Sequence, residues 1–174
     1  MQFRNLYNFV FGKMFGVPRV DSFERYLFIG PHPDDIELGC GALVASLAEA
    51  GKTVTFLICT DGRYGTGNRH DLTEEQMAQL RRKESLSAAA RLGVSDVRFL
   101  DFHDGHGYKD SDMEKAVAKV IGEVNPQVVF VTDPDTESEF HQDHTVIGRI
   151  TGYIVNFAVN APIMKSYGAG SADV

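Results

Sequence analysis

The chain has 174 residues, of which 43% are hydrophobic and 24% are charged, as expected for one globular domain with a buried core. Its formal net charge of -7 provides no basic surface for a phosphate backbone, which excludes nucleic acid as the main partner and favours a small-molecule substrate. The two cysteines, Cys40 and Cys59, are too few for a disulfide framework, so we expect reduced thiols and a cytoplasmic protein.

The N-terminal residues 1–20 form the first predicted element, an amphipathic helix that precedes a domain over 21–174. Apolar residues recur there at helical spacing: Phe3, Tyr7, Val10, Phe11 and Met14. The segment has no uninterrupted apolar stretch and no cleavage site, so it predicts neither a signal peptide nor a membrane span. Packing against the domain is the favoured interpretation, and contact with a membrane surface or a second copy of the chain is the alternative.

Strands and helices are predicted to alternate four times after this segment. Short apolar runs predict strands over 26–30, 53–60, 97–100 and 127–132. The helical spacing of apolar residues, with glycines at helix ends, predicts helices over 36–50, 73–93, 111–124 and about 144–159. A capping box at Thr73 and Gln76 indicates the start of the second helix, and Ser111 is the predicted first residue of the third. This alternation, with continuously apolar strands, predicts a doubly wound α/β fold with a mostly parallel sheet covered on both faces.

The predicted topology also indicates where a site should lie. Right-handed crossovers place the carboxyl ends of parallel strands at one edge of the sheet, where ligands bind in open α/β folds. The loops that follow Gly30, Thr60, Leu100 and Thr132 should therefore meet.

Two of these loops are rich in residues that bind metals. "PHPDDIELGCG" offers His32 and Asp35, three residues apart across a turn, and "HQDH" offers His141 and His144. Two imidazoles and one carboxylate are a common set for catalytic zinc, so one of the two later histidines would complete the site. Asp34 is then the candidate base for a metal-activated water, and the remaining histidine would stabilise an oxyanion or protonate a leaving amine. Such a site suits amide hydrolysis.

Four motifs in order resemble one family. "PHPDDIELGCG" and "HQDH" resemble the AHPDD and HxDH signatures of the LmbE-like, or PIG-L-type, zinc N-deacetylases. "RRKESLSAAARLGV" resembles the family's RxxE helix, and "RFLDFHDG" its following strand and acidic loop. The resemblance implies a Rossmann-like αβα sandwich that removes acetyl groups from N-acetylglucosamine-type sugar conjugates.

The resemblance also implies roles for individual residues. His32, Asp35 and His144 would bind one zinc ion, with other divalent metals left open, and Asp34 would be the general base. His141 would be the second catalytic histidine, whereas Arg81 and Asp104 would contact the substrate.

The chain departs from the family pattern at three points. Gln142 stands where proline is frequent, and Arg63 stands where an acidic residue is common. The sequence also ends at Val174, whereas family members usually continue and help to wall the pocket.

Alternative interpretations remain for several residues and for the function. Asp34 and Asp35 can serve as helix caps, Glu37 can support the site or lie on the surface, and Arg81 can belong to a solvated charged face. His103 and His106 are expected in a solvated loop. The alternative functions are a non-catalytic sugar- or nucleotide-binding module with a structural metal, and a two-carboxylate glycosidase, which leaves both motif histidines unexplained.

Overall fold

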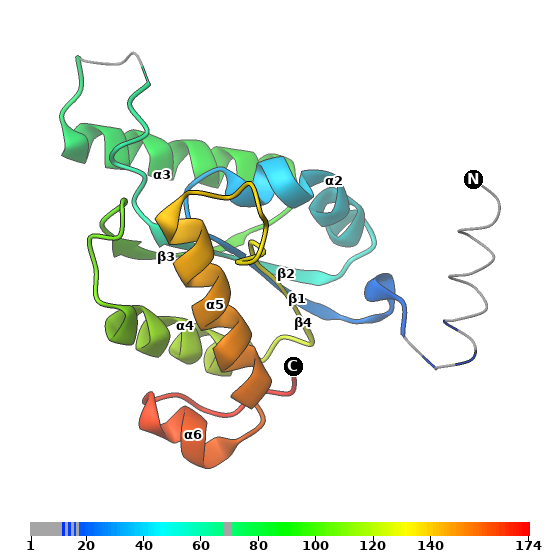
Figure 1. Ribbon diagram of the computed structural model, residues 1–174. Coiled ribbons are helices and arrows are strands. Elements are labelled where there is room, and N and C mark those ends of the chain that lie inside the picture. The colour runs from blue at the N-terminus through cyan, green and yellow to red at the C-terminus, as the bar shows by residue number, and fades with distance from the viewer. Residues whose placement is uncertain (1–11, 13, 15, 17, 68–70) are drawn as a thin grey trace.

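The computed structural model of the chain describes residues 12, 14, 16, 18–67 and 71–174 (Figure 1). The predicted amphipathic helix over 1–20 falls mostly outside the described residues and stays a prediction. The described elements, in chain order, are the 3-10 helix η1 (Val20–Ser22), β1 (Arg25–Gly30), α2 (Asp35–Glu49), β2 (Thr53–Thr60), α3 (Glu74–Arg91), β3 (Asp96–Phe102), α4 (Asp110–Val124), β4 (Val128–Phe130), α5 (Gln142–Phe157) and α6 (Ala161–Ser166).

The strands of the described chain form one parallel sheet in the order β3-β2-β1-β4. Tyr26 of β1 pairs with Val54 of β2 on one side and with Val128 of β4 on the other. All the strands run in the same direction, so their carboxyl ends lie at one edge. The predicted α/β fold with a parallel sheet is confirmed.

Helices cover both faces of the sheet, and each face has its own core (Figure 1). Successive strand side chains point to opposite faces, so Phe28 packs with α2 and α3 whereas Ile29 packs with α4 and α5. The α2 and α3 side is filled by Tyr26, Phe56, Ile58, Val44 and Leu47, and the other side by Leu27, Leu57, Val117, Ile121 and Ile147. Both faces of the sheet are buried, which explains why the strands are apolar along their length.

The predicted boundaries hold for some elements and fail for others. The capping box is present, since the Thr73 and Gln76 side chains each accept a hydrogen bond from the other residue's backbone N–H. The prediction that Ser111 begins a helix is wrong, because α4 begins at Asp110 with Lys109 at the N-cap position. There the charges of Asp110 and Asp112 in the first turn favour the helix start without a side-chain cap.

The chain after β3 also differs from the prediction at the strand β4 and at the C-terminus. β4 covers Val128–Phe130 rather than 127–132, and Gln127 before it accepts a hydrogen bond from the Glu24 N–H through its side chain. No helix is predicted beyond about residue 159, but the structure contains α6, which starts where the Asn160 side chain accepts a hydrogen bond from the Ile163 N–H. Within the described residues, every helix is too short or too polar to cross a membrane.

Candidate metal centre and active site

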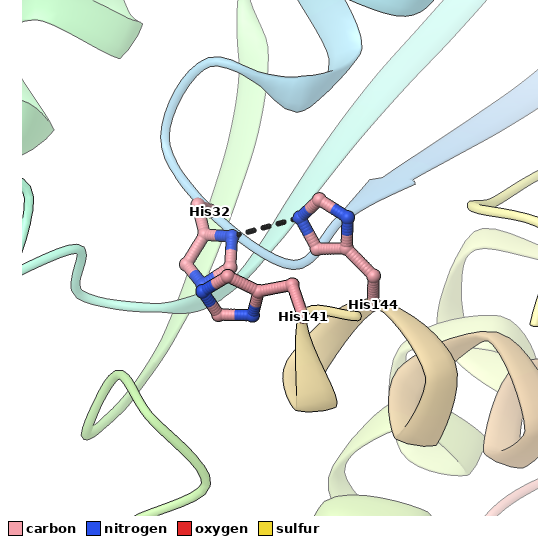
Figure 2. Close-up of side chains that lie close together, drawn as sticks. All are labelled: His32, His141 and His144. Atoms are coloured by element: carbon pink, nitrogen blue, oxygen red, sulfur yellow. Dashed lines mark hydrogen bonds between the residues drawn. The ribbon is translucent and has the colours of Figure 1, made fainter. Parts of the chain in front are cut away.

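The site lies where the four strand-end loops meet, as the topology predicts. His32 comes from the loop after β1, and His141 and His144 come from the start of α5, more than a hundred positions later in the chain (Figure 2). The imidazole rings of His32 and His141 lie 4.4 Å apart between centroids. The loops after β2 and β3 complete the surroundings with Tyr64 and Asp104.

Three donor atoms form a small triangle at the centre of the site. His32 Nδ1 lies 3.2 Å from His144 Nε2, and Asp35 Oδ2 lies 3.3 Å from each of those two nitrogens. Ligand atoms around a tetrahedral zinc with bonds of about 2.0–2.1 Å are separated by about 3.3 Å. The triangle therefore has the dimensions of one face of such a site.

The outer nitrogens of the two histidines are held by carboxylates. His144 Nδ1 lies 2.7 Å from Glu139 Oε2, and His32 Nε2 lies 3.0 Å from Asp104 Oδ1 and 3.2 Å from Asp143 Oδ2. A proton on each outer nitrogen leaves the inner nitrogens as lone-pair donors, which is how carboxylates orient metal-binding histidines. The sequence motifs predict no role for Glu139 or Asp143, and the structure places both carboxylates against ring nitrogens.

The charge balance of the site calls for a cation. Burial alone would lower the pKa of His32, but its hydrogen bonds to Asp104, Asp143 and Asp35 raise the pKa to about 11. Against the effect of burial, hydrogen bonds from His32 also keep the pKa of Asp35 below its usual value. In the metal-free protein, the positive charge that balances these carboxylates comes from protonated His32. A divalent metal ion would supply that charge in place of the proton, so the residues present fit such an ion. The histidines His32, His141 and His144 also offer donor atoms close enough to share one ion.

Asp143 is a fully buried carboxylate that connects α5 to the loop after β3. It accepts hydrogen bonds from the Gly105 N–H at 2.8 Å, the His106 N–H at 2.9 Å and the Tyr108 hydroxyl at 2.8 Å. Burial alone would raise the pKa of Asp143, but the bonds from His32, Tyr108 and Gly105 hold it well below the usual range. Asp143 is therefore a charged anchor behind His32.

Asp34 stands at the N-cap position of α2, yet its side chain makes no capping hydrogen bond. Its Oδ2 instead accepts a hydrogen bond from Arg81 Nη2, and the guanidinium also donates to Glu84 Oε2 at 3.0 Å. Among the described residues Oδ1 of Asp34 accepts no hydrogen bond, and Asp34 is one of the residues that line the cavity. Arg81 thus reaches the site from α3 and does not belong to a freely solvated face.

The open side of the site is a cavity of about 270 Å³. Its lining residues are His32, Asp34, Gly62, Tyr64, Gly65, Arg81, Asp104, Gly105 and His141. The side chain of His141 is 47% exposed, and its Nδ1 lies 3.9 Å from Asp143 Oδ2. His141 therefore faces the cavity, whereas His144 is largely covered.

Other residues that the sequence singled out lie around the site. Both carboxylate oxygens of Glu37 are buried without a hydrogen bond among the described residues, and burial raises its pKa, so Glu37 is not a plain surface residue. His106 is half-buried and bonds to Asp110 at 2.8 Å, whereas His103 is exposed as expected. Arg63 is paired with Asp61 at 2.7 Å.

Comparisons with known proteins agree on one family. The family model for PIG-L, GlcNAc-PI de-N-acetylase, matches residues 27–155. The chain is similar to the diacetylchitobiose deacetylase of Thermococcus kodakarensis, with 33% identity over 78% of this chain and 50% of the relative. It is also similar to the 1D-myo-inositol 2-acetamido-2-deoxy-alpha-D-glucopyranoside deacetylase of Kineococcus radiotolerans, with 34% identity over 88% of this chain and 50% of the relative.

A solved structure extends the likeness to the fold. The N,N'-diacetylchitobiose deacetylase of Pyrococcus horikoshii, complexed with its inhibitor MPG, superimposes with a TM-score of 0.84 and 26% identity. The likeness covers 99% of this chain and 66% of that chain. The chain spans about half the length of the two curated relatives.

Proposed function

The chain belongs to the PIG-L, or GlcNAc-PI de-N-acetylase, family, and on that premise we propose that it is a metal-dependent hydrolase that removes the acetyl group from an N-acetylated amino sugar. The observation that carries the proposal is the triangle of His32, Asp35 and His144 donor atoms, together with the cavity that His32 and Asp34 line. The substrate class is that of the relatives, whose names specify acetamido sugars.

In this proposal His32, Asp35 and His144 hold one divalent metal, with zinc as the favoured ion because the donor spacing and ligand types suit it. When bound, zinc supplies a Lewis acid that polarises the amide carbonyl and acidifies water. Glu139 supports the site by holding the His144 ring in one tautomer.

Asp34 is the general base of the proposed reaction. Its Oδ1 takes a proton from the attacking water as the new carbon–oxygen bond forms, while Arg81 holds Oδ2 and fixes the direction of the carboxylate. The same proton then passes to the nitrogen as the carbon–nitrogen bond breaks. The products are acetate and a free amine.

His141 and two further cavity residues act on the substrate. His141 faces the cavity and donates a hydrogen bond to the carbonyl oxygen as that atom gains negative charge. Arg81 and Asp104 line the same cavity, where their polar atoms would contact sugar hydroxyls as well as their protein partners.

Acetate release tests the proposal directly. The chain is assayed with N-acetylglucosamine and N,N'-diacetylchitobiose after chelation and again after zinc is added back. We expect loss of acetate release on chelation and recovery with zinc. Tightly held zinc without acetate release from either sugar would support a non-catalytic module with a structural metal. Release of N-acetylglucosamine from N,N'-diacetylchitobiose that resists chelation, without acetate, would support a glycosidase that uses two carboxylates.

A further inference from the structure

Tyr64 is an exposed aromatic residue at the mouth of the proposed active site. It follows β2 in the segment "DGRYG" and lines the same cavity as Asp34 and His141. Tyr64 is 56% exposed and lines the open part of this cavity. Neither the motifs nor the proposed chemistry assigns Tyr64 a role.

The position of Tyr64 is fixed from two directions. Its backbone N–H donates to Asp104 Oδ2 at 3.3 Å, and the other oxygen of Asp104 lies 3.0 Å from His32 Nε2. One edge of its ring rests on Gly105, where an added Cβ would lie 3.4 Å from both Cδ2 and Cε2. Gly105 has a φ of +74°, a conformation that favours glycine. The backbone of Tyr64 is therefore bonded to the carboxylate that contacts His32, and its ring lies beside Gly105.

The rest of the cavity lining lacks a large apolar surface. Tyr64 is the one aromatic hydrocarbon ring among the lining residues, which otherwise offer charged groups, imidazoles and the glycines Gly62, Gly65 and Gly105. A pyranose ring has hydroxyls around its edge and C–H groups on its faces, so it suits an aromatic face beside polar groups. An acyclic acetamide has no such face and gains little from an aromatic ring.

We propose that Tyr64 is a specificity-determining residue that stacks against the pyranose ring of the substrate and places its acetamide group between Asp34 and His141. This inference rests on the proposed function. It predicts preference for cyclic N-acetylhexosamines over acyclic acetamides, and it assigns that preference to Tyr64.

The test compares Tyr64→Ala and Tyr64→Phe in the zinc-loaded chain of residues 1–174, with N-acetylglucosamine and N-acetylethanolamine as substrates. Tyr64→Ala should raise KM for the sugar about tenfold and leave KM for the acyclic amide unchanged, because only the sugar loses a stacking partner. Tyr64→Phe keeps the ring and should stay within about threefold of the parent chain for both substrates. Tyr153→Ala, which removes a similarly exposed tyrosine from α5, is the matched control.

A binding measurement separates this inference from the proposed function. Saturation-transfer NMR with N-acetylglucosamine should show contact between the protein and the pyranose C–H groups, and Tyr64→Ala should abolish it. If no substrate releases acetate but this contact is present and depends on Tyr64, the proposed function fails, whereas the stacking of Tyr64 on the pyranose ring is upheld. Equal effects of Tyr64→Ala on both substrates, or ring contact that persists in Tyr64→Ala, would overturn the inference.

Discussion

The protons of His32 and His144 determine what the inner triangle binds. Glu139 contacts the outer nitrogen of His144, and Asp104 and Asp143 contact the outer nitrogen of His32. Protons on these outer nitrogens leave lone pairs on both inner nitrogens. Those nitrogens are only 3.2 Å apart, a contact that requires one proton or one metal ion between them. A metal ion therefore takes the place of a proton that the metal-free protein holds.

Asp34→Asn tests the assignment of the base. The amide keeps the shape of the side chain but cannot accept a proton, so kcat for acetate release should fall by about 10²- to 10⁴-fold while zinc content and KM change little. Glu84→Gln, which removes the other carboxylate bonded to Arg81, controls for a change in the charge around the guanidinium. An unchanged kcat in Asp34→Asn would remove Asp34 from the mechanism.

Glu139→Ala tests the support of His144. Loss of the 2.7 Å contact frees the imidazole to rotate and to change tautomer, so we expect zinc affinity to fall by about 10- to 100-fold. Glu137→Ala removes an exposed acid from the same loop and should leave zinc affinity unchanged. Equal zinc affinity for the two variants would contradict the role of Glu139. Competition with a chromogenic chelator measures both.

Part of the site could be predicted from the sequence, and there is a physical reason why the other part could not. His32 and His144 were placed together because topology brings the loops after the first and fourth strands to one edge. Glu139 and Asp143 could not be separated from the other acids of their segment, because residue type does not say which carboxylate reaches a ring nitrogen. Tyr64 gave no signal, since a lone tyrosine in a glycine-rich loop is compatible with many roles.

The elements followed the sequence most closely where the pattern was local. The bounds of β2 match the prediction because its apolar run is flanked by clear breaks, and α3 begins after its capping box. The predicted start of α4 differs by one residue from the observed start. Acidic residues in the first turn favour a helix start but do not fix its first residue, as a side-chain cap does. The short α6 lies beyond the last periodic apolar run.

α5 brings His141, Asp143 and His144 to the site, and Gly148 allows it to approach the end of β4. A Cβ at Gly148 would lie 2.5 Å from the carbonyl oxygen of Thr132, whose hydroxyl donates to the His144 carbonyl at 3.0 Å. Gly148→Ala should therefore push α5 away from β4, destabilise the fold by about 1–3 kcal/mol and weaken zinc binding.

Gly152 provides the matched comparison for Gly148 on the same helix. A Cβ there meets no atom within 4 Å, so Gly152→Ala should stabilise the protein by about 0.5–1 kcal/mol through helix propensity, with zinc binding retained. Urea unfolding and zinc titration measure both quantities. If Gly148→Ala proved as stable as Gly152→Ala, close packing of α5 would not position the site.

For the whole molecule, metal binding is coupled to the protonation of the site. His32 has its pKa raised to about 11 by the surrounding carboxylates, so it is protonated throughout the neutral range in the metal-free protein. Zinc must displace that proton to reach Nδ1, and protons compete better as the pH falls. Zinc affinity should therefore drop about tenfold per pH unit for each proton displaced, between about pH 8 and about pH 6.

Chelator competition at several pH values measures that slope, and calorimetry in buffers of different ionisation enthalpy counts the protons released. His103→Ala removes an exposed histidine from the loop after β3 and should leave the slope unchanged, whereas His32→Ala should abolish tight binding. A zinc affinity that does not vary with pH would mean that His32 binds as a neutral ring without exchanging a proton. In that case the carboxylates around His32 would not keep its ring protonated in the metal-free protein, and their charge would not require a cation at this edge of the sheet.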